Sequence, residues 1–279
     1  MKQHNYKKRK ISKKGFLFST ISLTLLALLL LFSSLYAKEI HSRSNRSVDE
    51  FKLIREEFIE KEIAYNFLNI LNISYKNSTI TDKNTSIYFS KFTNLGVINL
   101  NILDKYEKFL EGNYSKKINQ EIDLSDFNPS FYIYPFESLW SVNETNITIL
   151  TSENNNIERI EITLKINSSI SSNITPTEDS SGSFLYIKII DPEGNKFNFE
   201  GLLNRSDTDN EIKVLNSTNY LSINYGNINQ NGTLSITTEG LSADIYNFSV
   251  TYNKSSNFLI YTKAYLNMSY KNGRIKLIE

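Results

Sequence analysis

The stretch from Phe16 to Tyr36 reads FLFSTISLTLLALLLLFSSLY and carries no charged residue. As an α-helix it would span about 31 Å, at about 1.5 Å per residue, which matches the roughly 30 Å hydrocarbon core of a bilayer. Seven cationic residues precede it, and no acidic residue occurs before Glu39. Because cations favour the cytoplasmic side, the pattern predicts a transmembrane helix over residues 16–36, with a basic leader (1–15) in the cytoplasm and residues 38–279 outside the cell.

A cleaved signal peptide is the alternative interpretation of this segment. Signal peptides have apolar cores of about 7 to 15 residues and small side chains at the third and first positions before the cut. Leu35 and Ala37 would take those two positions, and leucine is not small. The long apolar run and the poor cleavage site therefore favour a retained membrane anchor.

The residues beyond the membrane segment are acidic overall, although the whole chain has a net charge of +1. Without the seven N-terminal cations, 24 basic residues remain against 30 acidic ones, a net charge of −6. This argues against nucleic acid as a partner, because phosphate binding needs clustered Lys and Arg. The chain also has no cysteine. Since exported eukaryotic domains commonly carry disulfides, the composition favours a prokaryotic, archaeal surface protein.

Asn-X-Ser/Thr triplets, the acceptors of N-glycosylation, are about twice as frequent as chance predicts. The 35 Asn and 53 Ser or Thr would give about six to seven triplets by random placement, and 15 are present. They lie at Asn45, Asn72, Asn77, Asn84, Asn113, Asn143, Asn146, Asn167, Asn173, Asn204, Asn216, Asn231, Asn247, Asn253 and Asn267. An Asn-rich composition produces some of them by accident. The excess, and the placement beyond the membrane segment, predict that several carry glycans, which would make the surface bulky and solvated.

Residues 37–75 are predicted to form a helical stalk. From Phe51 onward, apolar residues recur three and four positions apart, as in an amphipathic helix that ends near Asn72. These residues are Ile54, Phe58, Ile59, Ile63, Phe67, Leu68 and Leu71. No Gly or Pro between Ala37 and Ser47 forces a helix to stop, but Ser47 and Glu50 also match a capping box. The stalk therefore either continues the membrane helix, as one helix of about 80 Å, or starts afresh after a hinge.

Residues 76–168 are predicted to mix helix and strand. Apolar spacing predicts a helix over 95–110 that ends before Gly112, and alternation of apolar and polar residues predicts a strand over 159–166. Residues 131–136 are aromatic and interrupted by proline, which indicates a short or edge strand. Residues 169–183 are rich in Ser, Thr, Asn and Pro and are predicted to be a linker between domains.

Residues 184–279 are predicted to form a β-sandwich domain. The pattern places strands at 185–190, 196–199, 212–215, 220–225, 234–237, 246–252 and 260–270. The sequence Asp191-Pro192-Glu193-Gly194 predicts a hairpin turn, and Asn272-Gly273 a two-residue turn into a last strand. The predicted fold class is therefore α+β, with an N-terminal transmembrane and stalk helix followed by a β-rich head with a C-terminal β-sandwich.

Few residues could perform catalysis. The two histidines, His4 and His41, lie in the leader and beside the membrane segment, and the ten glycines form no phosphate loop. The sequence therefore predicts no catalytic activity, no cofactor and no metal. Residues 207–211 (DTDNE) could bind calcium, but they lack EF-hand spacing and are predicted to be a solvated loop. The carboxylate pairs Glu56–Glu57 and Glu178–Asp179 are also predicted to be solvated, rather than to act as acid and base.

The segment Ser12-Lys13-Lys14-Gly15-Phe16-Leu17, leading into Thr20-Ile21-Ser22-Leu23, resembles the leader junction of type IV pilin-like proteins. In that family a peptidase cuts after the glycine of a basic leader, and many archaeal surface proteins share a leader of this kind. The following phenylalanine then heads a hydrophobic helix that packs in a filament core. The resemblance implies cleavage between Gly15 and Phe16, and a long helix that carries a β-rich head. Thr20 departs from the family pattern, because most bacterial pilins have Glu at this position.

Together these features predict a single-pass, membrane-anchored extracellular glycoprotein, a pilin-like structural or adhesion component. Its partners would be the lipid bilayer and neighbouring pilin-like helices or surface proteins. The alternative is a membrane-anchored binding module that captures glycan, peptide or calcium. The 17 Tyr and 17 Phe would suit stacking on sugars, although their alternation along strands favours core packing. A membrane-tethered hydrolase is a third hypothesis.

Overall fold

The computed structural model describes residues 13–151, 157–204, 206–207, 210–216, 218–226 and 233–278. Side chains are described from residue 21 on, Thr233 excepted. The chain divides into two compact units, Met1–Arg55 and Glu56–Glu279. Three predicted features lie wholly or partly outside the described residues. They are most of the basic leader, the sequon residue Asn231, and residues 208–209 of the segment considered for calcium binding.

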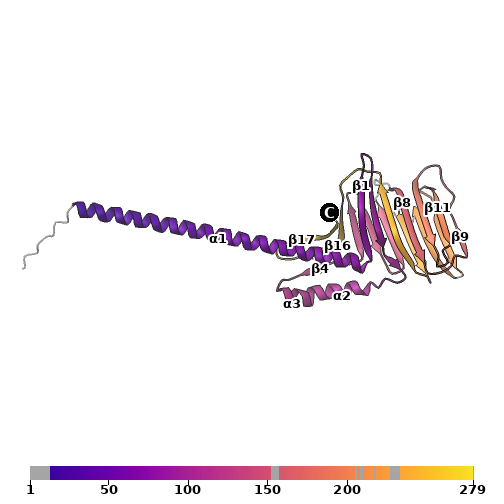
Figure 1. The fold of residues 1–279 in the computed structure, drawn as a ribbon, viewed down its shortest axis with the longest axis horizontal. Coiled ribbons are helices and arrows are strands. Elements are labelled where there is room, and N and C mark those ends of the chain that lie inside the picture. Colours follow the sequence, from indigo (N-terminus) through magenta and orange to yellow (C-terminus); the bar gives the residue numbers. More distant parts are fainter. Residues whose placement is uncertain are drawn as a thin grey trace, which may run out of the picture. The chain divides into compact units, whose positions relative to one another are not determined.

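Helix α1 (Lys13–Ile70) is uninterrupted over 58 residues (Figure 1). The predicted stalk therefore continues the predicted membrane segment, the first of the two alternatives, and no new helix starts after Ser47. No Gly or Pro breaks the helix there, and Arg43 forms a 2.6 Å ion pair with Glu39 one turn earlier. The helix ends close to the predicted position, where Asn72 takes a left-handed backbone conformation with φ 57°.

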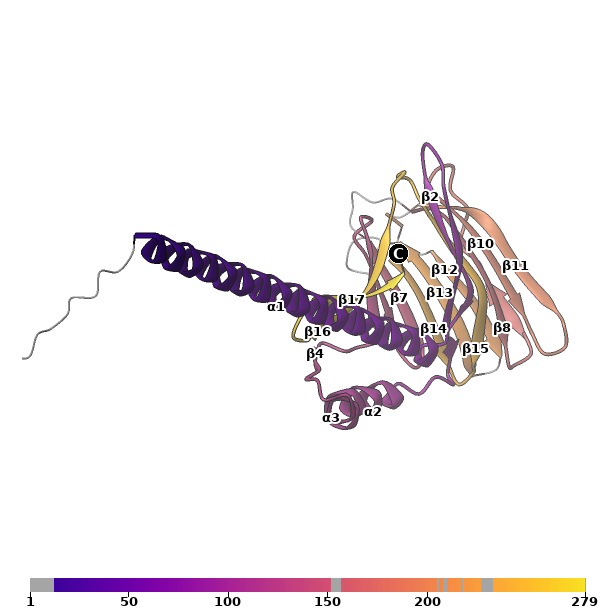
Figure 2. The same ribbon diagram turned by 60° about the vertical axis from the view of Figure 1, so that its left-hand side comes forward.

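Most of the remaining described chain forms two β-sheets packed face to face (Figures 1 and 2). Sheet A has the order β1-β2-β15-β8-β10-β11, with β3 beside β15. Its strands are β1 (Ile73–Ile80), β2 (Thr85–Phe92), β3 (Asn94–Leu95), β8 (Ile157–Ile166), β10 (Ser183–Ile190), β11 (Lys196–Leu203) and β15 (Ala243–Tyr252).

Sheet B has the order β17-β16-β5-β6-β7-β14-β13-β12-β9, with β4 beside β16. Its strands are β4 (Asp123–Ser125), β5 (Ser130–Tyr134), β6 (Ser138–Val142), β7 (Asn146–Thr151), β9 (Ser172–Ile174), β12 (Glu211–Asn216), β13 (Asn219–Gly226), β14 (Thr233–Glu239), β16 (Leu259–Asn267) and β17 (Asn272–Ile278). The chain is thus α+β, with a long N-terminal helix and a β-rich sandwich.

The sandwich draws strands from both sides of residues 169–183, which differs from the predicted linker and separate sandwich over 184–279. Strand β8 lies before this segment and pairs in parallel with β10 after it, with Ile162 opposite Ile187. Part of the segment is itself strand β9, paired with β12. The physical reason is that strands from both parts of the chain pair side by side in each sheet, since β15 lies between β2 and β8 and β14 pairs with β7.

The predicted strands at 159–166, 212–215, 220–225, 234–237 and 246–252 are confirmed as β8, β12, β13, β14 and β15. The proline-interrupted segment is confirmed as a short strand, the five-residue β5, but it is not an edge, because β5 lies between β16 and β6. The predicted helix over 95–110 starts later, as α2 (Asn101–Phe109), and continues through the π-helical η1 (Leu110–Tyr114) into α3 (Ser115–Ile118). Gly112 does not end it, since the left-handed residue that does is Asn119, with φ 52°.

The two predicted hairpins differ in outcome. Strands β10 and β11 pair around the predicted turn, where Gly194 has a φ of 86° and its N–H donates to the Asp191 carbonyl at 3.1 Å. The last turn is not at Asn272-Gly273, which lie in β17, but at residues 268–271. There the Met268 N–H donates to the Lys271 carbonyl at 2.8 Å. Two carboxylates of α1 hold this turn: Glu56 accepts the backbone N–H of Tyr270, and Glu60 forms an ion pair with Lys271.

Asp191 holds the β10–β11 turn through its side chain. Its carboxylate accepts the backbone N–H and the side-chain amide of Asn195, each at 2.8 Å. Burial alone would raise the pKa of Asp191, but these hydrogen bonds outweigh burial and lower it. Because the folded-state pKa lies below the ordinary value, the carboxylate stabilises the fold above that value, and the stabilisation is lost as the pH falls through the folded-state pKa.

We therefore expect Asp191→Asn to melt at a lower temperature than the natural chain at pH 7. The difference should begin to shrink below about pH 4, where the carboxyl of the unfolded chain becomes protonated, and should shrink further as the pH falls through the lower folded-state pKa. Thermal melts followed by circular dichroism at both pH values measure this. Glu200→Gln, an exposed change on β11, is the control. A difference between natural chain and Asp191→Asn that does not depend on pH would contradict the assignment.

The centre of the sandwich is aromatic. Trp140 of β6 packs against Phe89, Phe92 and Phe248 of sheet A, with ring centroids 5.2 to 5.5 Å apart, and against Phe131 of β5 at 5.5 Å. All five side chains are buried. The indole N–H of Trp140 donates to a hydroxyl of the same strand, so the one tryptophan leaves no polar group unpaired. This cluster joins the two sheets.

Candidate functional site

The apolar run within the first unit is fully exposed. Side chains from Ile21 to Tyr36 are exposed, including Leu23 at 70 % and Leu29 at 65 %. By length and composition this part of α1 is a candidate membrane span, and none of its apolar window is buried within the chain. A continuous exposed leucine surface of this kind is unfavourable in water and favourable in lipid. Gly15 and Phe16, the predicted cleavage junction, both lie within α1.

The second unit holds the end of α1 through two buried carboxylates. Glu56 and Glu60 are only 1 % and 5 % exposed, which corrects the prediction that Glu56 is solvated, whereas Glu57 is exposed. Glu56 accepts the backbone N–H of Tyr270 at 2.8 Å and an amide N–H of Gln120. The carboxylates of Glu56 and Glu60 therefore face the rest of the second unit rather than water.

Glu60 binds the edge of sheet B. Its carboxylate accepts the backbone N–H of Lys276, in edge strand β17, at 3.0 Å and forms a 2.5 Å ion pair with Lys271. The buried apolar side chains Ile59, Ile63 and Phe67 lie on the same face of α1. Residues three and four positions apart share a helix face. This face of α1 therefore contacts the rest of the second unit both through buried apolar side chains and through the two glutamates. Two predicted members of the face are exposed instead, Ile54 at 63 % and Phe58 at 66 %.

Glu60→Ala is expected to lower the free energy of unfolding by about 2 kcal/mol, since hydrogen bonds to charged groups are each worth about 1.5–3 kcal/mol. The substitution leaves a backbone N–H and a partly exposed ammonium without their acceptor. Urea denaturation of the detergent-solubilised full chain measures the loss. Glu57→Ala, at the exposed neighbour, is the matched control and should change stability by less than about 0.5 kcal/mol. Equal losses in the two variants would contradict this role for Glu60.

Helix α2 and the π-turn contact the same end of α1. Asn66 donates its amide N–H to the Tyr106 hydroxyl oxygen at 2.9 Å, and the Tyr114 hydroxyl donates to Glu62 at 2.9 Å. Burial raises the pKa of Tyr106 to about 12, although the bond from Asn66 works in the other direction. Tyr106 therefore stays protonated at neutral pH and has a packing role.

A hollow of about 350 Å³ lies on the outer face of sheet A. Four residues in register cross it from strand to strand: Tyr88, Ser249, Glu161 and Tyr186. Serine is much smaller than the two tyrosines, so the surface dips between them. The remaining lining residues are Lys76, Phe89, Thr163, Asn247 and Phe248. Asn247 has a φ of 71° and sits in a bulge of β15, where the register with β8 shifts.

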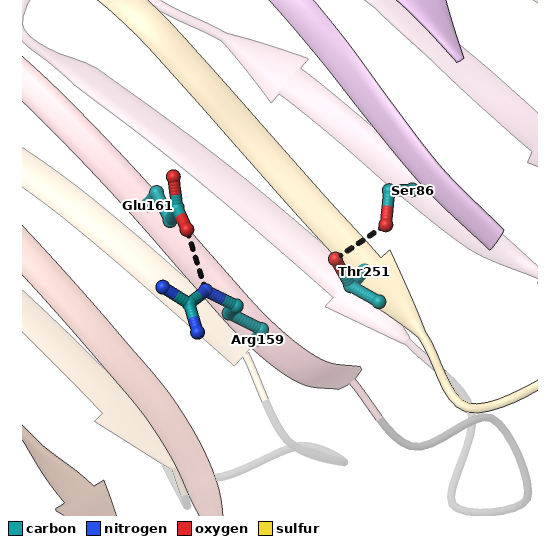
Figure 3. A network of polar contacts seen from close by, with 4 residues as sticks. All are labelled: Ser86, Arg159, Glu161 and Thr251. Atoms are coloured by element: carbon teal, nitrogen blue, oxygen red, sulfur yellow. Dashed lines mark hydrogen bonds and ion pairs between the residues drawn. The ribbon is translucent and has the colours of Figure 1, made fainter. Parts of the chain in front are cut away.

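The neighbouring row of polar side chains is paired internally (Figure 3). The hydroxyls of Ser86 and Thr251 lie 2.8 Å apart, and Arg159 donates to Glu161 at 2.5 Å. Both ionic side chains are more than 40 % exposed, so this pair contributes little stability. Glu161 links this row to the hollow, which its side chain also lines.

The other candidate residues from the sequence do not line the hollow. His41 is exposed on α1, and Glu178 and Asp179 lie on an exposed segment beside β11, with a backbone hydrogen bond from Ser180 lowering the pKa of Asp179. Among the described residues, no group of three or more His, Cys, Asp or Glu could hold a metal ion. The hollow and its two tyrosines were not singled out by the sequence, because strand register alone brings them together.

None of the described sequon asparagines is buried. Nine are exposed: Asn45, Asn77, Asn113, Asn143, Asn167, Asn173, Asn247, Asn253 and Asn267. Five are partly buried: Asn72, Asn84, Asn146, Asn204 and Asn216. Some amides are already engaged, as where Asn84 donates to Glu158 at 3.1 Å. The nine exposed asparagines are more accessible to a glycosyltransferase than the five partly buried ones.

Comparisons with known proteins identify no relative. No family model matches the chain, and no curated protein or solved structure is significantly similar to it. The fold and the exposed apolar surface define its class: a β-sandwich protein with a long N-terminal helix that includes a candidate membrane span.

Proposed function

We propose that the chain is a single-pass membrane glycoprotein that acts as a structural or adhesion component at the cell surface. Residues 16–36 would anchor it, with residues 1–15 in the cytoplasm and residues 38–279 outside. The observation that carries the proposal is the exposed apolar surface from Ile21 to Tyr36, behind seven cationic residues. Burying it in lipid is favourable by about 25 cal/mol per Å² of apolar area, and the cations set the orientation.

The pilin-like part of the proposal rests on two features. Gly15 follows a basic leader and precedes Phe16, and one uninterrupted helix runs from this junction into the second unit. In a pilin-like arrangement the helix would contact neighbouring helices, and the β-sandwich would be displayed. No catalytic step is assigned to the head.

Mass spectrometry of the N-terminus of the protein isolated from its own cells tests the pilin-like part. Cleavage of the leader predicts Phe16 as the first residue. A variant Gly15→Leu should retain the leader, because the peptidase of this family cuts after glycine. An intact Met1 in a host with an active prepilin peptidase would contradict the pilin-like part of the proposal. It would not contradict the proposal of a membrane-anchored glycoprotein.

A saccharide-binding module is the second candidate function, and the hollow on sheet A favours it. Tyr88 and Tyr186 flank Glu161, a combination of aromatic faces and a charged hydrogen-bond acceptor that suits sugar rings. Saturation-transfer NMR with a panel of neutral saccharides tests it. Binding that is lost in Tyr88→Ala and retained in Tyr265→Ala, an exposed tyrosine of β16, would establish the site. No saturation transfer to any saccharide would count against it.

A further inference from the structure

The main strand path of sheet A ends at β1 and β11, and that of sheet B ends at β17 and β9 (Figure 1); the short strands β3 and β4 lie off these paths. An edge strand presents backbone N–H and C=O groups that a strand from another molecule can pair with. Natural β-proteins therefore cover, shorten or charge their edges. The four strands at the ends of these paths fall into two groups.

Two edges are covered by the chain itself. At β17, Glu60 of α1 accepts the backbone N–H of Lys276 at 3.0 Å. At β11, the backbone N–H of Asp179 donates to the Leu202 carbonyl at 2.9 Å. The covering segment lies so close that a Cβ on Gly201 would come within 2.7 Å of the Glu178 side chain. Neither edge strand contains a sequon asparagine.

Among the described residues, edges β1 and β9 have no such backbone partner, and each contains one exposed sequon asparagine. These are Asn77 in β1 and Asn173 in β9. Each edge also exposes an isoleucine, Ile80 at 44 % and Ile174 at 50 %. An open backbone edge beside an exposed β-branched apolar side chain is a site for pairing between chains.

The two open edges have only partial protection without glycans. Strand β1 has register shifts on both sides of Tyr75, and the exposed Lys76 follows. A bulge and a lysine both discourage pairing, but residues 77–80 after the bulge are in continuous register with β2. Strand β9 is three residues long, which limits but does not abolish pairing. A bulky group at Asn77 and at Asn173 would complete the protection.

We propose that Asn77 and Asn173 are glycosylated, and that their glycans shield the two open sheet edges from pairing with other chains. This inference rests on the proposed extracellular glycoprotein. The asparagine Nδ2 would form a bond to the anomeric carbon of an oligosaccharide carried on a lipid phosphate or diphosphate. The anomeric C–O bond breaks, the lipid phosphate leaves with the electron pair, and the amide nitrogen loses one proton.

The side chains of both asparagines are open to this reaction. Both are exposed, and neither makes a side-chain hydrogen bond to the described residues, in contrast to Asn84, whose amide donates to Glu158. The loop sequons at Asn143 and Asn253 are equally exposed but lie outside any strand. They provide a matched comparison in which the same number of glycans is removed away from the edges.

The experiment compares the natural full chain with three variants, each expressed in its own host and solubilised in detergent. The edge variant is Asn77→Gln with Asn173→Gln, and the control is Asn143→Gln with Asn253→Gln. A second edge variant, Thr79→Ala with Thr175→Ala, removes the same two sequons and keeps the asparagines. Glycopeptide mass spectrometry measures occupancy, circular dichroism the melting temperature, and light scattering the rate of aggregation.

We expect glycans at both edge sites, unchanged melting temperatures, and aggregation that is several-fold faster in both edge variants than in the control. Equal aggregation of edge and control variants would overturn the shielding role, and so would a lower melting temperature of the edge variants, because unfolding would then explain the aggregation. Bare edge sites with glycans elsewhere would overturn this inference alone. No glycan on any sequon would also overturn the glycoprotein part of the proposed function.

Discussion

Replacing Leu26 and Leu29 together with arginine is expected to move the protein from the membrane fraction to the soluble or degraded fraction. Both side chains lie at the middle of the apolar run and are more than half exposed. An arginine at the centre of a transmembrane helix costs about 2.5–3.5 kcal/mol, so two of them oppose insertion by about 6 kcal/mol. That is more than a ten-thousandfold change in the insertion equilibrium, by the relation of about 1.4 kcal/mol per factor of ten. Fractionation after alkaline carbonate extraction measures it.

The matched control for this change is on the same helix. Val48→Arg with Phe51→Arg places the same charges on exposed apolar residues outside the run. These positions lie beyond the predicted span, so the control protein should stay in the membrane fraction. If Leu26→Arg with Leu29→Arg remains membrane-bound as firmly as the control, the apolar run is not the anchor.

The second large effect is expected from Trp140→Ala, which should lower the free energy of unfolding by about 3–5 kcal/mol. Trp140 is completely buried and contacts aromatic rings from both sheets, so its removal leaves a cavity at the centre of the sandwich. A loss of this size is a large fraction of the usual stability of about 5–15 kcal/mol. Urea denaturation followed by far-UV circular dichroism is suitable, because the variant has no tryptophan to report by fluorescence.

Tyr265→Ala is the control for the core change, because Tyr265 is an aromatic residue of β16 that is 45 % exposed. It should cost less than about 1 kcal/mol, as expected for a change away from the core. Trp140→Phe should cost less than Trp140→Ala, since a ring still fills most of the space. Similar stabilities for Trp140→Ala and the natural chain would show that the sheets do not depend on this cluster.

Local patterns predicted most elements of the fold, and failed where distant residues decide. The alternation over 159–166 and the turn at Asp191–Gly194 were sufficient for β8 and the β10–β11 hairpin. The polar composition of 169–183 suggested a boundary. The parallel pairing of β8 with β10 across it depends on contacts between strands that composition does not encode.

The apolar pattern predicted most of the buried face of α1, with Ile59, Ile63 and Phe67 buried, but it did not predict the buried glutamates. Positions 56, 59, 60, 63 and 67 share one face, and the two glutamates among them are buried because the edge of sheet B supplies N–H donors. A pattern based on apolar residues alone omits these glutamates and adds Ile54 and Phe58, which are exposed. The hollow on sheet A could not be predicted either, since the register of four strands aligns Tyr88 with Tyr186.

Protease added to intact cells tests the central claim most directly. If the chain is anchored by residues 16–36 with the head outside, external protease should cleave the head and leave a short membrane-embedded fragment that begins at Phe16 or Met1. A cytoplasmic protein should stay intact in the same sample and confirm that the cells are closed. A head that survives until the cells are lysed would contradict the proposed topology.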